Sequence, residues 1–250
     1  MRTYFDVNMQ LGRGSVPVLG AATSAHEAIR EMDHAGIARA IVWHPAQQGV
    51  YPGAGNDLIS RMIAGVPRLE AAWAPLPPTP REVVTPAFFD EMKAAGVRVL
   101  RVLPADHRYL LRRSVMGRFF DDVAERRIPV LLSPEWGVPF EAMDDILADY
   151  PSLTAVVCDV GIWGADRKVW PLLENYSHLC VETSLVSLEA GGLEAGVRRF
   201  GASRFLFGSK FPHRYFEAPM LDLEHADLPP ADKDAIAAGN LESLLEEVVL

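Results

Sequence analysis

Short apolar runs alternate along this chain with longer stretches in which apolar residues recur every three or four positions. Runs rich in β-branched and aliphatic residues, bounded by polar or turn residues, predict buried β-strands. We identify eight such runs, at residues 3–8, 38–44, 69–76, 97–103, 128–133, 153–159, 178–184 and 204–209.

The stretches between these runs carry the periodicity of amphipathic helices. The first has a serine cap at Ser24 and a glycine stop at Gly36, and the second stops at Gly96. The predicted helices cover residues 24–36, 85–96, 117–127, 140–150, 193–201 and 230–248. Eight strands alternating with helices over this length predict an α/β fold of the (β/α)₈ TIM-barrel type.

The main competing architecture is an open, doubly wound sheet. No predicted strand leads into a GxGxxG or Walker-type phosphate loop, so this alternative lacks support. The proline-rich piece at 74–86 is the best candidate for a domain boundary, but it is short and joins segments of similar composition. We therefore expect a loop there, within a single barrel domain covering residues 1–250.

Composition narrows the classes of partner. Apolar residues make up 49% of the chain, and 33 acidic residues outweigh 24 basic ones to give a net charge of −9. That balance argues against a nucleic-acid or anionic-membrane surface, which would need a clustered positive face. The N-terminus lacks a signal-peptide core, and no stretch approaches the roughly 20 apolar residues that span a bilayer. We expect a soluble, cytoplasmic protein, with a homo-oligomer compatible with the sequence.

The two cysteines, Cys158 and Cys180, lie in separate apolar runs and form no CxxC pair. We therefore expect buried free thiols rather than a disulfide or a zinc knuckle.

Polar residues gather where the predicted strands end, which in a (β/α)₈ barrel is where reactive groups lie. Clustered polar groups need partners, water or a ligand, so we expect a polar pocket at the barrel mouth. The residues in this set are Asp6, Asn8, Gln10, Trp43, His44, Arg101, Ser133, Glu135, Asp159, Glu182, Thr183, Ser184, Lys210 and His213.

The order of segments resembles the amidohydrolase-related family of metal-dependent barrel hydrolases and decarboxylases, over nearly the whole chain. "YFDVNMQLG" is similar to the family's opening strand, which usually reads Asp-x-His-x-His-x-Gly, and "RFLFGSKFPH" is similar to its Gly-Ser-Asp-Phe/Tyr-Pro. Further similar segments are "GNDLISRMIAGVPRLEAAWAPLPP", where an Asn-Asp pair starts a helix in the family, and "AGVRVLRVLP", "RRIPVLLSPEWG", "PSLTAVVCDVGIWG" and "AIAAGNLESLL".

The departures from this family pattern fall on the metal ligands. The resemblance maps five ligand positions onto this chain, and the family's histidines and aspartate are replaced there by Asn8, Gln10, Ser133, Asp159 and Lys210. Amide and hydroxyl oxygens do not make the imidazole-and-carboxylate shell of zinc or a similar metal. A protonated lysine offers no lone pair and repels a divalent cation. We predict no metal, no other cofactor, and an ion pair between Lys210 and Asp159.

Three functional interpretations remain open. In the first, Lys210 and Arg101 bind a small anionic, carboxylate-type molecule, and a metal-independent hydrolysis of an ester or lactone follows by resemblance to the family. Lys210, with the candidate bases Asp159, Glu135 and His44, forms the catalytic set. The expected substrate-binding residues are Arg101, Asn8, Gln10, Ser133, His213 (itself a further candidate base), Trp43, Trp136 and Trp163.

The second interpretation is a non-catalytic pseudoenzyme in which the network of Lys210 and Asp159 replaces the metal structurally. The third is a Schiff-base lyase that uses Lys210 as its nucleophile. A carboxylate at Asp159 disfavours the third interpretation, because a nearby negative charge favours the protonated, non-nucleophilic amine. For the histidines and tryptophans, plain packing roles compete with binding roles.

Overall fold

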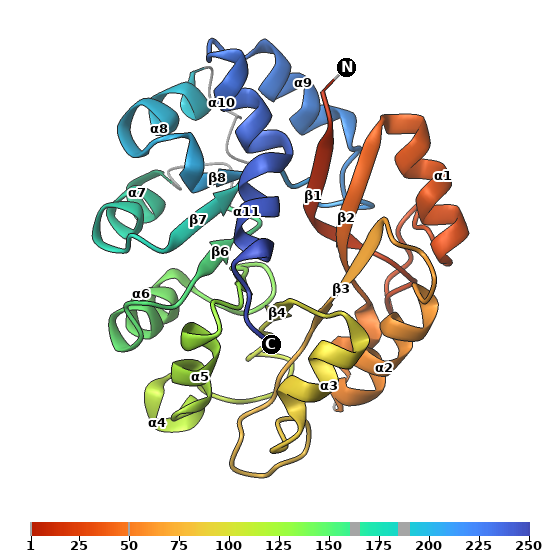
Figure 1. Ribbon diagram of the computed structural model, residues 1–250, viewed down its shortest axis with the longest axis vertical. Helices are drawn as coiled ribbons and strands as arrows, with labels where there is room; N and C mark the ends of the chain where they lie inside the picture. Colours follow the sequence, from red (N-terminus) through yellow and green to blue (C-terminus); the bar gives the residue numbers. More distant parts are fainter. Residues whose placement is uncertain (1, 50, 161–165, 185–190) are drawn as a thin grey trace.

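Eight parallel strands form one sheet in the computed structural model, and each strand pairs with its neighbours in chain order. Two backbone hydrogen bonds bring the first and last strands together: Val7 N donates to Phe207 O at 3.0 Å and Gln10 N to Phe211 O at 2.8 Å. The chain is therefore a (β/α)₈ TIM barrel (Figure 1). The strands are β1 (Tyr4–Gln10), β2 (Ile37–Trp43), β3 (Leu69–Trp73), β4 (Val99–Arg101), β5 (Val130–Leu132), β6 (Ala155–Val157), β7 (Leu179–Glu182) and β8 (Phe205–Leu206).

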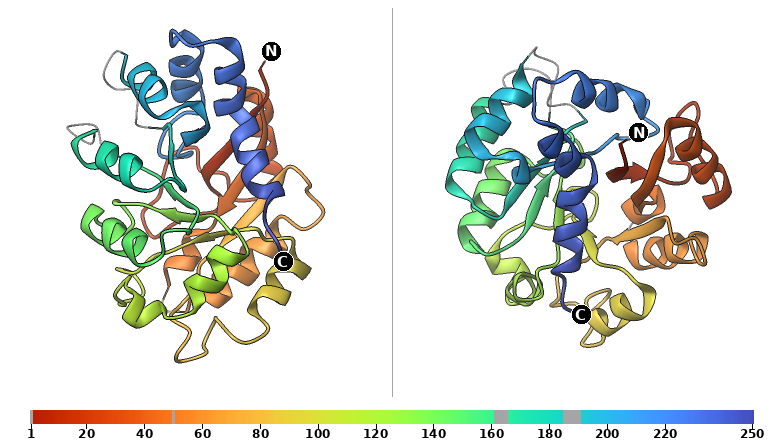
Figure 2. Two further views of the ribbon diagram at one scale, coloured as in Figure 1. Left: turned by 60° about the vertical axis from the view of Figure 1, so that its left-hand side comes forward. Right: turned by 45° about the horizontal axis from the view of Figure 1, so that its top comes forward.

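The structure describes residues 2–49, 51–160, 166–184 and 191–250. Helices surround the strands on the outside (Figures 1 and 2). They are α1 (Ala25–Ala35), α2 (Pro52–Met62), α3 (Phe88–Ala95), α4 (Arg113–Met116), α5 (Phe119–Glu125), α6 (Phe140–Asp149), α7 (Asp166–Asn175), α8 (Gly192–Phe200), α9 (Glu217–His225), α10 (Pro230–Asp234) and α11 (Asn240–Glu246), with short helices η1 (Pro45–Gln48), η2 (Ala202–Arg204) and η3 (Ala235–Gly239). None of the helices in the described ranges is both long and apolar enough to cross a bilayer.

Two apolar layers make the core. One lies between the strands and the outer helices, and the other fills the barrel interior, with Phe5, Val7 and Ile41 among its members. Leu241 and Leu245 of α11 join the interior cluster. Arg98, just before β4, donates to Leu245 O at 3.1 Å, so α11 closes the end of the barrel at which the strands begin. The opposite end, where the strands finish, is where a TIM barrel is expected to carry its functional site.

All six helical segments that periodicity predicts are present, with the long C-terminal one divided into α10, η3 and α11. Ser24 caps α1 as expected, accepting from Glu27 N. The expected loop at 74–86 contains no helix or strand. Both cysteines are buried and free, which confirms that prediction.

Some helices differ from expectation. The prediction of a helix start at the Asn-Asp pair of residues 56–57 is wrong, because α2 begins at Pro52 and Asn56 lies inside it. The buried Asn56 side chain has a tertiary role: its Oδ1 accepts from Ala74 N at 2.8 Å and its Nδ2 donates to Ala74 O at 3.0 Å. Helices α4, α7 and α9 were not predicted, and the last two contain Pro171 and Pro219. Proline in a sequence argues against a helix, because it lacks the backbone N–H donor, although helices tolerate it in their first turn or where they kink.

Candidate functional site

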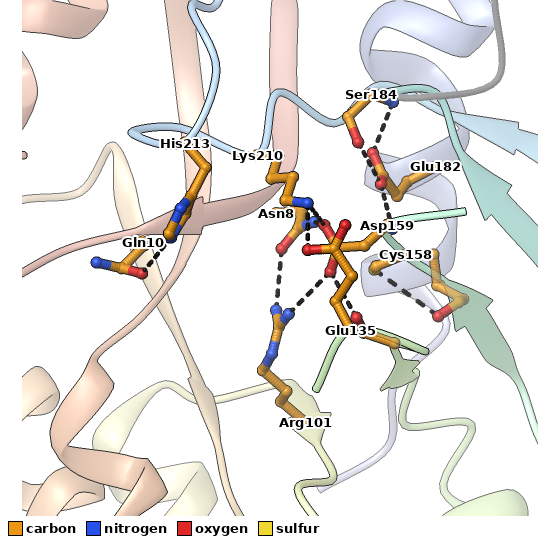
Figure 3. Close-up of polar contacts among 12 residues, drawn as sticks. Asn8, Gln10, Arg101, Glu135, Cys158, Asp159, Glu182, Ser184, Lys210 and His213 are labelled. Carbon is orange, nitrogen blue, oxygen red and sulfur yellow. Dashed lines mark hydrogen bonds and ion pairs between the residues drawn. The ribbon is translucent and has the colours of Figure 1, made fainter. Parts of the chain in front are cut away.

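Polar side chains from the ends of β1, β4, β5, β6, β7 and β8 meet at the end of the barrel where the strands finish (Figure 3). Asp159 is the centre of the cluster and is fully buried. Its carboxylate accepts hydrogen bonds from Ser133 Oγ at 2.6 Å and from Asn8 Nδ2 at 3.0 Å. Both partners are buried themselves, so this carboxylate is held rigidly in a largely dry environment.

Arg101 lies beneath Asp159 and is only 2% exposed. Its guanidinium donates to Asn8 Oδ1 at 2.9 Å, lies 4.6 Å from the centre of the Trp43 ring, and approaches Asp159 Oδ2 to 3.6 Å. The Nε and NH2 donors have no hydrogen-bond partner among the described residues. Unpaired buried donors cost free energy, so Arg101 is an under-satisfied cation beside the Asp159 carboxylate.

Lys210 extends into the same cluster from the turn after β8. Its Nζ lies 3.8 Å from Asp159 Oδ1, and it donates a closer hydrogen bond to Glu135 in the turn after β5. The Lys210 side chain is 11% exposed, whereas that of Glu135 is 46% exposed. The predicted ion pair with Asp159 is thus present as a long contact, and Glu135 is the nearer partner.

The backbone at both charged residues is left-handed. Asp159 has φ 55° and Lys210 has φ 60°, a region that residues with a Cβ rarely adopt. Such conformations persist where the surroundings over-determine them, and they concentrate at functional sites. Each of these two turns is held by a buried carboxylate on a neighbouring strand, Glu182 for the turn of Asp159 and Asp6 for the turn of Lys210.

Glu182 at the end of β7 holds the turn of Asp159. Its carboxylate accepts from Asp159 N at 2.7 Å, from Ser184 N at 2.8 Å and from Ser184 Oγ at 2.6 Å. Gly208 leaves room for this carboxylate, because a Cβ on Gly208 would lie 2.2 Å from Glu182 Oε2.

Asp6 in β1 does the same for the turn that carries Lys210. It accepts from Asn8 N at 2.9 Å, from Ser209 N at 3.0 Å and from Ser209 Oγ. Ser209 Oγ also accepts from Phe211 N at 2.9 Å, on the other side of Lys210. We call Asp6 and Glu182 the two clamp carboxylates. The sequence showed both as strand-end acids without revealing this role.

The clamp carboxylates are fully buried, and burial raises the pKa of each. Desolvation raises the pKa of Asp6 from 3.8 to about 6, against the opposing effect of its hydrogen bonds from Ser209 and Asn8. It raises that of Glu182 from 4.5 to about 7, and the nearby charge of Asp159 adds to the increase.

A bulge in β1 directs two amide side chains into the mouth. Asp6 pairs with Ala40 but Met9 pairs with Val42, so β1 uses one residue more than β2 over this stretch. Phe5, before the bulge, and Val7, within it, face the barrel interior. Asn8, also within the bulge, reaches Asp159, and Gln10 after it has its Oε1 3.1 Å from His213 Nε2.

Aromatic rings and His213 form the wall of the mouth. Trp136 packs edge-on against Trp43 with ring centres 5.1 Å apart and against His213 at 6.1 Å. Burial, and next the charge of Lys210, lower the pKa of His213, which keeps its imidazole neutral near pH 7. Of the predicted tryptophans, Trp163 lies outside the described residues.

The cavity inside this wall is small. It measures about 10 Å³, the space of roughly one water, and is lined by Asn8, Gln10, Trp43, Trp136, Asp159, Lys210, Phe211 and His213.

His44 has a structural task outside that lining. Its Nδ1 accepts from Ala46 N at 2.9 Å and so caps the short helix η1. Its ring also fills the space beside Gly12, where a Cβ would lie 2.1 Å from Nε2. Burial lowers the pKa of His44. These contacts explain the residue by packing and capping, and a catalytic part for His44 stays a prediction.

The donor atoms at the mouth do not fit a transition-metal ion. No group of three or more His, Cys, Asp or Glu residues in the described ranges could hold one. The central carboxylate of Asp159 already accepts two hydrogen bonds, and the Lys210 ammonium lies 3.8 Å away. Metal independence remains a prediction that rests on this donor chemistry.

Solved structures that superpose on this barrel include decarboxylases and a candidate hydrolase. A 2,6-dihydroxybenzoate decarboxylase complexed with 2,6-dihydroxybenzoate superposes with a TM-score of 0.79 at 15% identity, covering 98% of this chain and 99% of that one. The 5-carboxyvanillate decarboxylase of Sphingomonas paucimobilis has a TM-score of 0.74 at 13% identity over the whole of both chains. A candidate 2-pyrone-4,6-dicarboxylic acid hydrolase from Pseudomonas putida has a TM-score of 0.69 at 17% identity, again over the whole of both chains.

Comparisons of the sequence alone, by contrast, found no match. No model of a known protein family matches the chain, and no curated protein matches it significantly. At these low identities the superpositions establish a shared fold, and the resemblance read from the sequence motifs is confirmed at that level.

Proposed function

We propose that this chain, a single-domain barrel like those decarboxylases and hydrolases, binds a small carboxylate-type anion at the barrel mouth without a metal ion. The observation that carries the proposal is the surplus of donors around Asp159. Arg101 has unpaired buried donors, and Lys210 has three N–H groups of which one makes a hydrogen bond in the structure. An acceptor-only ligand at Lys210, which lines the cavity, satisfies the free N–H groups of the ammonium, and the buried Arg101 adds positive charge nearby.

The names of the structural neighbours support the same ligand class. The 2,6-dihydroxybenzoate, 5-carboxyvanillate and 2-pyrone-4,6-dicarboxylic acid in those names all carry carboxylates, and the last is also a lactone. We extend the proposal to hydrolysis of an ester or lactone that carries such a carboxylate. His213, a neutral imidazole in the cavity wall, is the residue best suited to act as its general base.

A non-catalytic role is the second candidate, and the small cavity favours it. With about 10 Å³ available and Lys210 already bonded to Glu135, the charged network resembles a structural replacement for a metal. A Schiff-base reaction has the least support, because the Lys210 amine is engaged with Glu135 and lies 3.8 Å from Asp159.

Calorimetric titration tests ligand binding. Acetate and benzoate are titrated into the protein after dialysis against a chelator, with benzamide as the neutral control. We expect both acids to bind, benzamide to fail, and Lys210→Met to lose carboxylate binding. Lys233→Met, which removes the same charge from α10, should leave binding unchanged. The proposal is overturned if neither acid binds, or if binding returns only when a metal ion is added.

A further inference from the structure

Glu135 occupies the position at which an anionic ligand would meet Lys210. It comes from the turn that follows β5 and places a carboxylate on the Lys210 ammonium (Figure 3). The mouth contains few other free acceptors, because both oxygens of Asp159 already accept hydrogen bonds from Asn8 and Ser133. Glu135 therefore offers Lys210 a carboxylate, the same chemical group that the proposed ligand carries.

The two partners depend on this contact unequally. Lys210 is 11% exposed, so its ammonium has little access to water and needs a nearby acceptor. Glu135 is 46% exposed, and water can solvate its carboxylate equally well when the contact is broken. Ion pairs with a solvent-exposed member contribute little net stability. Exchanging the Glu135 carboxylate for another one is accordingly a low-cost event.

The backbone under Glu135 is held in place. Trp136 N and Val138 N both donate to Ser133 O, at 3.2 and 3.0 Å. Gly137 has φ 85° and packs so closely that a Cβ there would lie 2.3 Å from Ala105 Cβ. Release of Lys210 thus needs only a rotation of the Glu135 side chain, with the turn itself unmoved.

We propose that Glu135 is a displaceable internal ligand of Lys210, and that a small monocarboxylate enters the mouth by replacing its carboxylate. This inference rests on the proposed function and adds the route and the charge of the ligand. Replacement of one carboxylate by another conserves charge beside Lys210, whose Nζ lies 3.8 Å from Asp159 Oδ1, whereas a phosphate dianion would add a further negative charge near that carboxylate. Lys210, the partner that Glu135 would release, lines the small cavity of the mouth.

The test compares carboxylate affinities with and without the internal ligand. Acetate, benzoate and inorganic phosphate are titrated into the wild type, Glu135→Gln and Glu135→Ala at one pH and ionic strength. Because a competing exposed ion pair is removed, both variants should bind the two acids about three- to tenfold more tightly. Phosphate should bind more weakly than acetate in every form.

Glu174→Gln is the matched control. Glu174 pairs with Arg199 on the outer helices α7 and α8, so this change removes the same formal charge far from Lys210. We expect wild-type affinity from it, which separates the effect of the contact from that of net charge. Glu174→Gln should melt near the wild type, because both members of its ion pair are exposed. The Glu135 variants should melt slightly lower, because the nearly buried Lys210 loses its nearest acceptor.

Each outcome decides a different point. If the wild type and both Glu135 variants bind the acids with equal affinity and Lys210→Met does not bind them, Glu135 is not displaced by the ligand. The proposed function then still stands. Weaker binding in the Glu135 variants also overturns the displacement of Glu135, since Glu135 would then belong to the ligand site. Absence of carboxylate binding in every form overturns both proposals.

Discussion

Asp159 and Lys210 show how single residues define this site. Each bears a charge, each is the left-handed residue of its turn, and each comes from a strand end. The carboxylate is entirely buried and the ammonium nearly so. A buried charge is stable only with compensating partners, so the energetics of the pair should be coupled.

Lys210→Met should lower the free energy of unfolding by about 1–3 kcal/mol, less than the full cost of breaking a buried pair because Arg101, Asn8 and Ser133 still surround Asp159. Adding Asp159→Asn should recover part of the loss, since the uncompensated carboxylate is gone. Urea unfolding of the four forms gives the coupling energy, expected above about 0.5 kcal/mol.

The control cycle combines Lys210→Met with Asp145→Asn on α6, whose partner is Arg112, and should be additive. Additivity in the first cycle as well would mean that Lys210 and Asp159 do not interact, and that Glu135 alone holds the ammonium.

At the scale of elements, the strand ends are locked to one another by the two clamp carboxylates. Asp6 and Glu182 each accept a hydrogen bond from the backbone N–H of the residue two positions later in the chain. Each also accepts one from a backbone N–H in the turn after a neighbouring strand. These bonds fix the turns after β6 and β8, and hence the directions of the charged side chains that the turns carry.

Gly208→Ala should destabilise the protein by about 1–3 kcal/mol, because the new Cβ meets a carboxylate that three hydrogen bonds hold in place. The comparison is Gly14→Ala, where the nearest atom is 3.6 Å from the added carbon and a change near zero is expected. Chemical denaturation measures both. A Gly208→Ala protein as stable as the Gly14→Ala protein would show that Glu182 moves aside freely.

The clamp carboxylates also predict a pH dependence of stability. Their pKa values are about 6 and about 7 in the folded chain, above the ordinary 3.8 and 4.5, so the folded state binds these protons more tightly than the unfolded state. Their contribution to stability is therefore complete below about pH 4 and is lost as the pH rises through 6 to 7.

Glu182→Gln removes one of these titrations. The wild-type free energy of unfolding minus that of the variant should fall by about 1–3 kcal/mol between pH 4 and pH 7.5. Denaturant titrations at several pH values measure this difference, which cancels contributions from other groups. A difference that is flat or rises with pH would contradict the burial argument for Glu182.

For the molecule as a whole, the two ends of the barrel have separate tasks. One end is closed by apolar side chains of α11, and Phe207 N donates to Ile236 O at 2.9 Å beside it. The other end carries the charged network. The apolar closure and the charged network thus lie at opposite ends, and in TIM barrels the end where the strands finish is the usual place for a site.

The intact protein is expected to contain no stoichiometric zinc, iron or manganese. Amide and hydroxyl groups and an ammonium near Asp159 make a poor shell for these ions. Elemental analysis of the purified chain gives the metal content, and a thermal melt with added zinc should show no upward shift. About one metal per chain, removable with loss of stability, would contradict the assignment of Lys210 as the cation of the site.

Local patterning alone determined the number and order of the strands, the extent of the capped helices and the polar character of the strand ends. Periodicity and caps act over a few neighbouring residues, and those are visible in sequence. The sequence also predicted that Arg101, Asp159 and Lys210 lie at one end of the barrel, because all the parallel strands finish at that end.

Only the tertiary structure decided how those residues meet. The bulge in β1, the clamping of one strand end by the next, and the contact of Lys210 with Glu135 across 75 positions depend on which strands lie side by side and how far apart. Helix α7, with Pro171 in its interior, likewise forms against local preference. Contacts between residues distant in the chain carry no periodic signal, so their geometry appears only when the barrel closes.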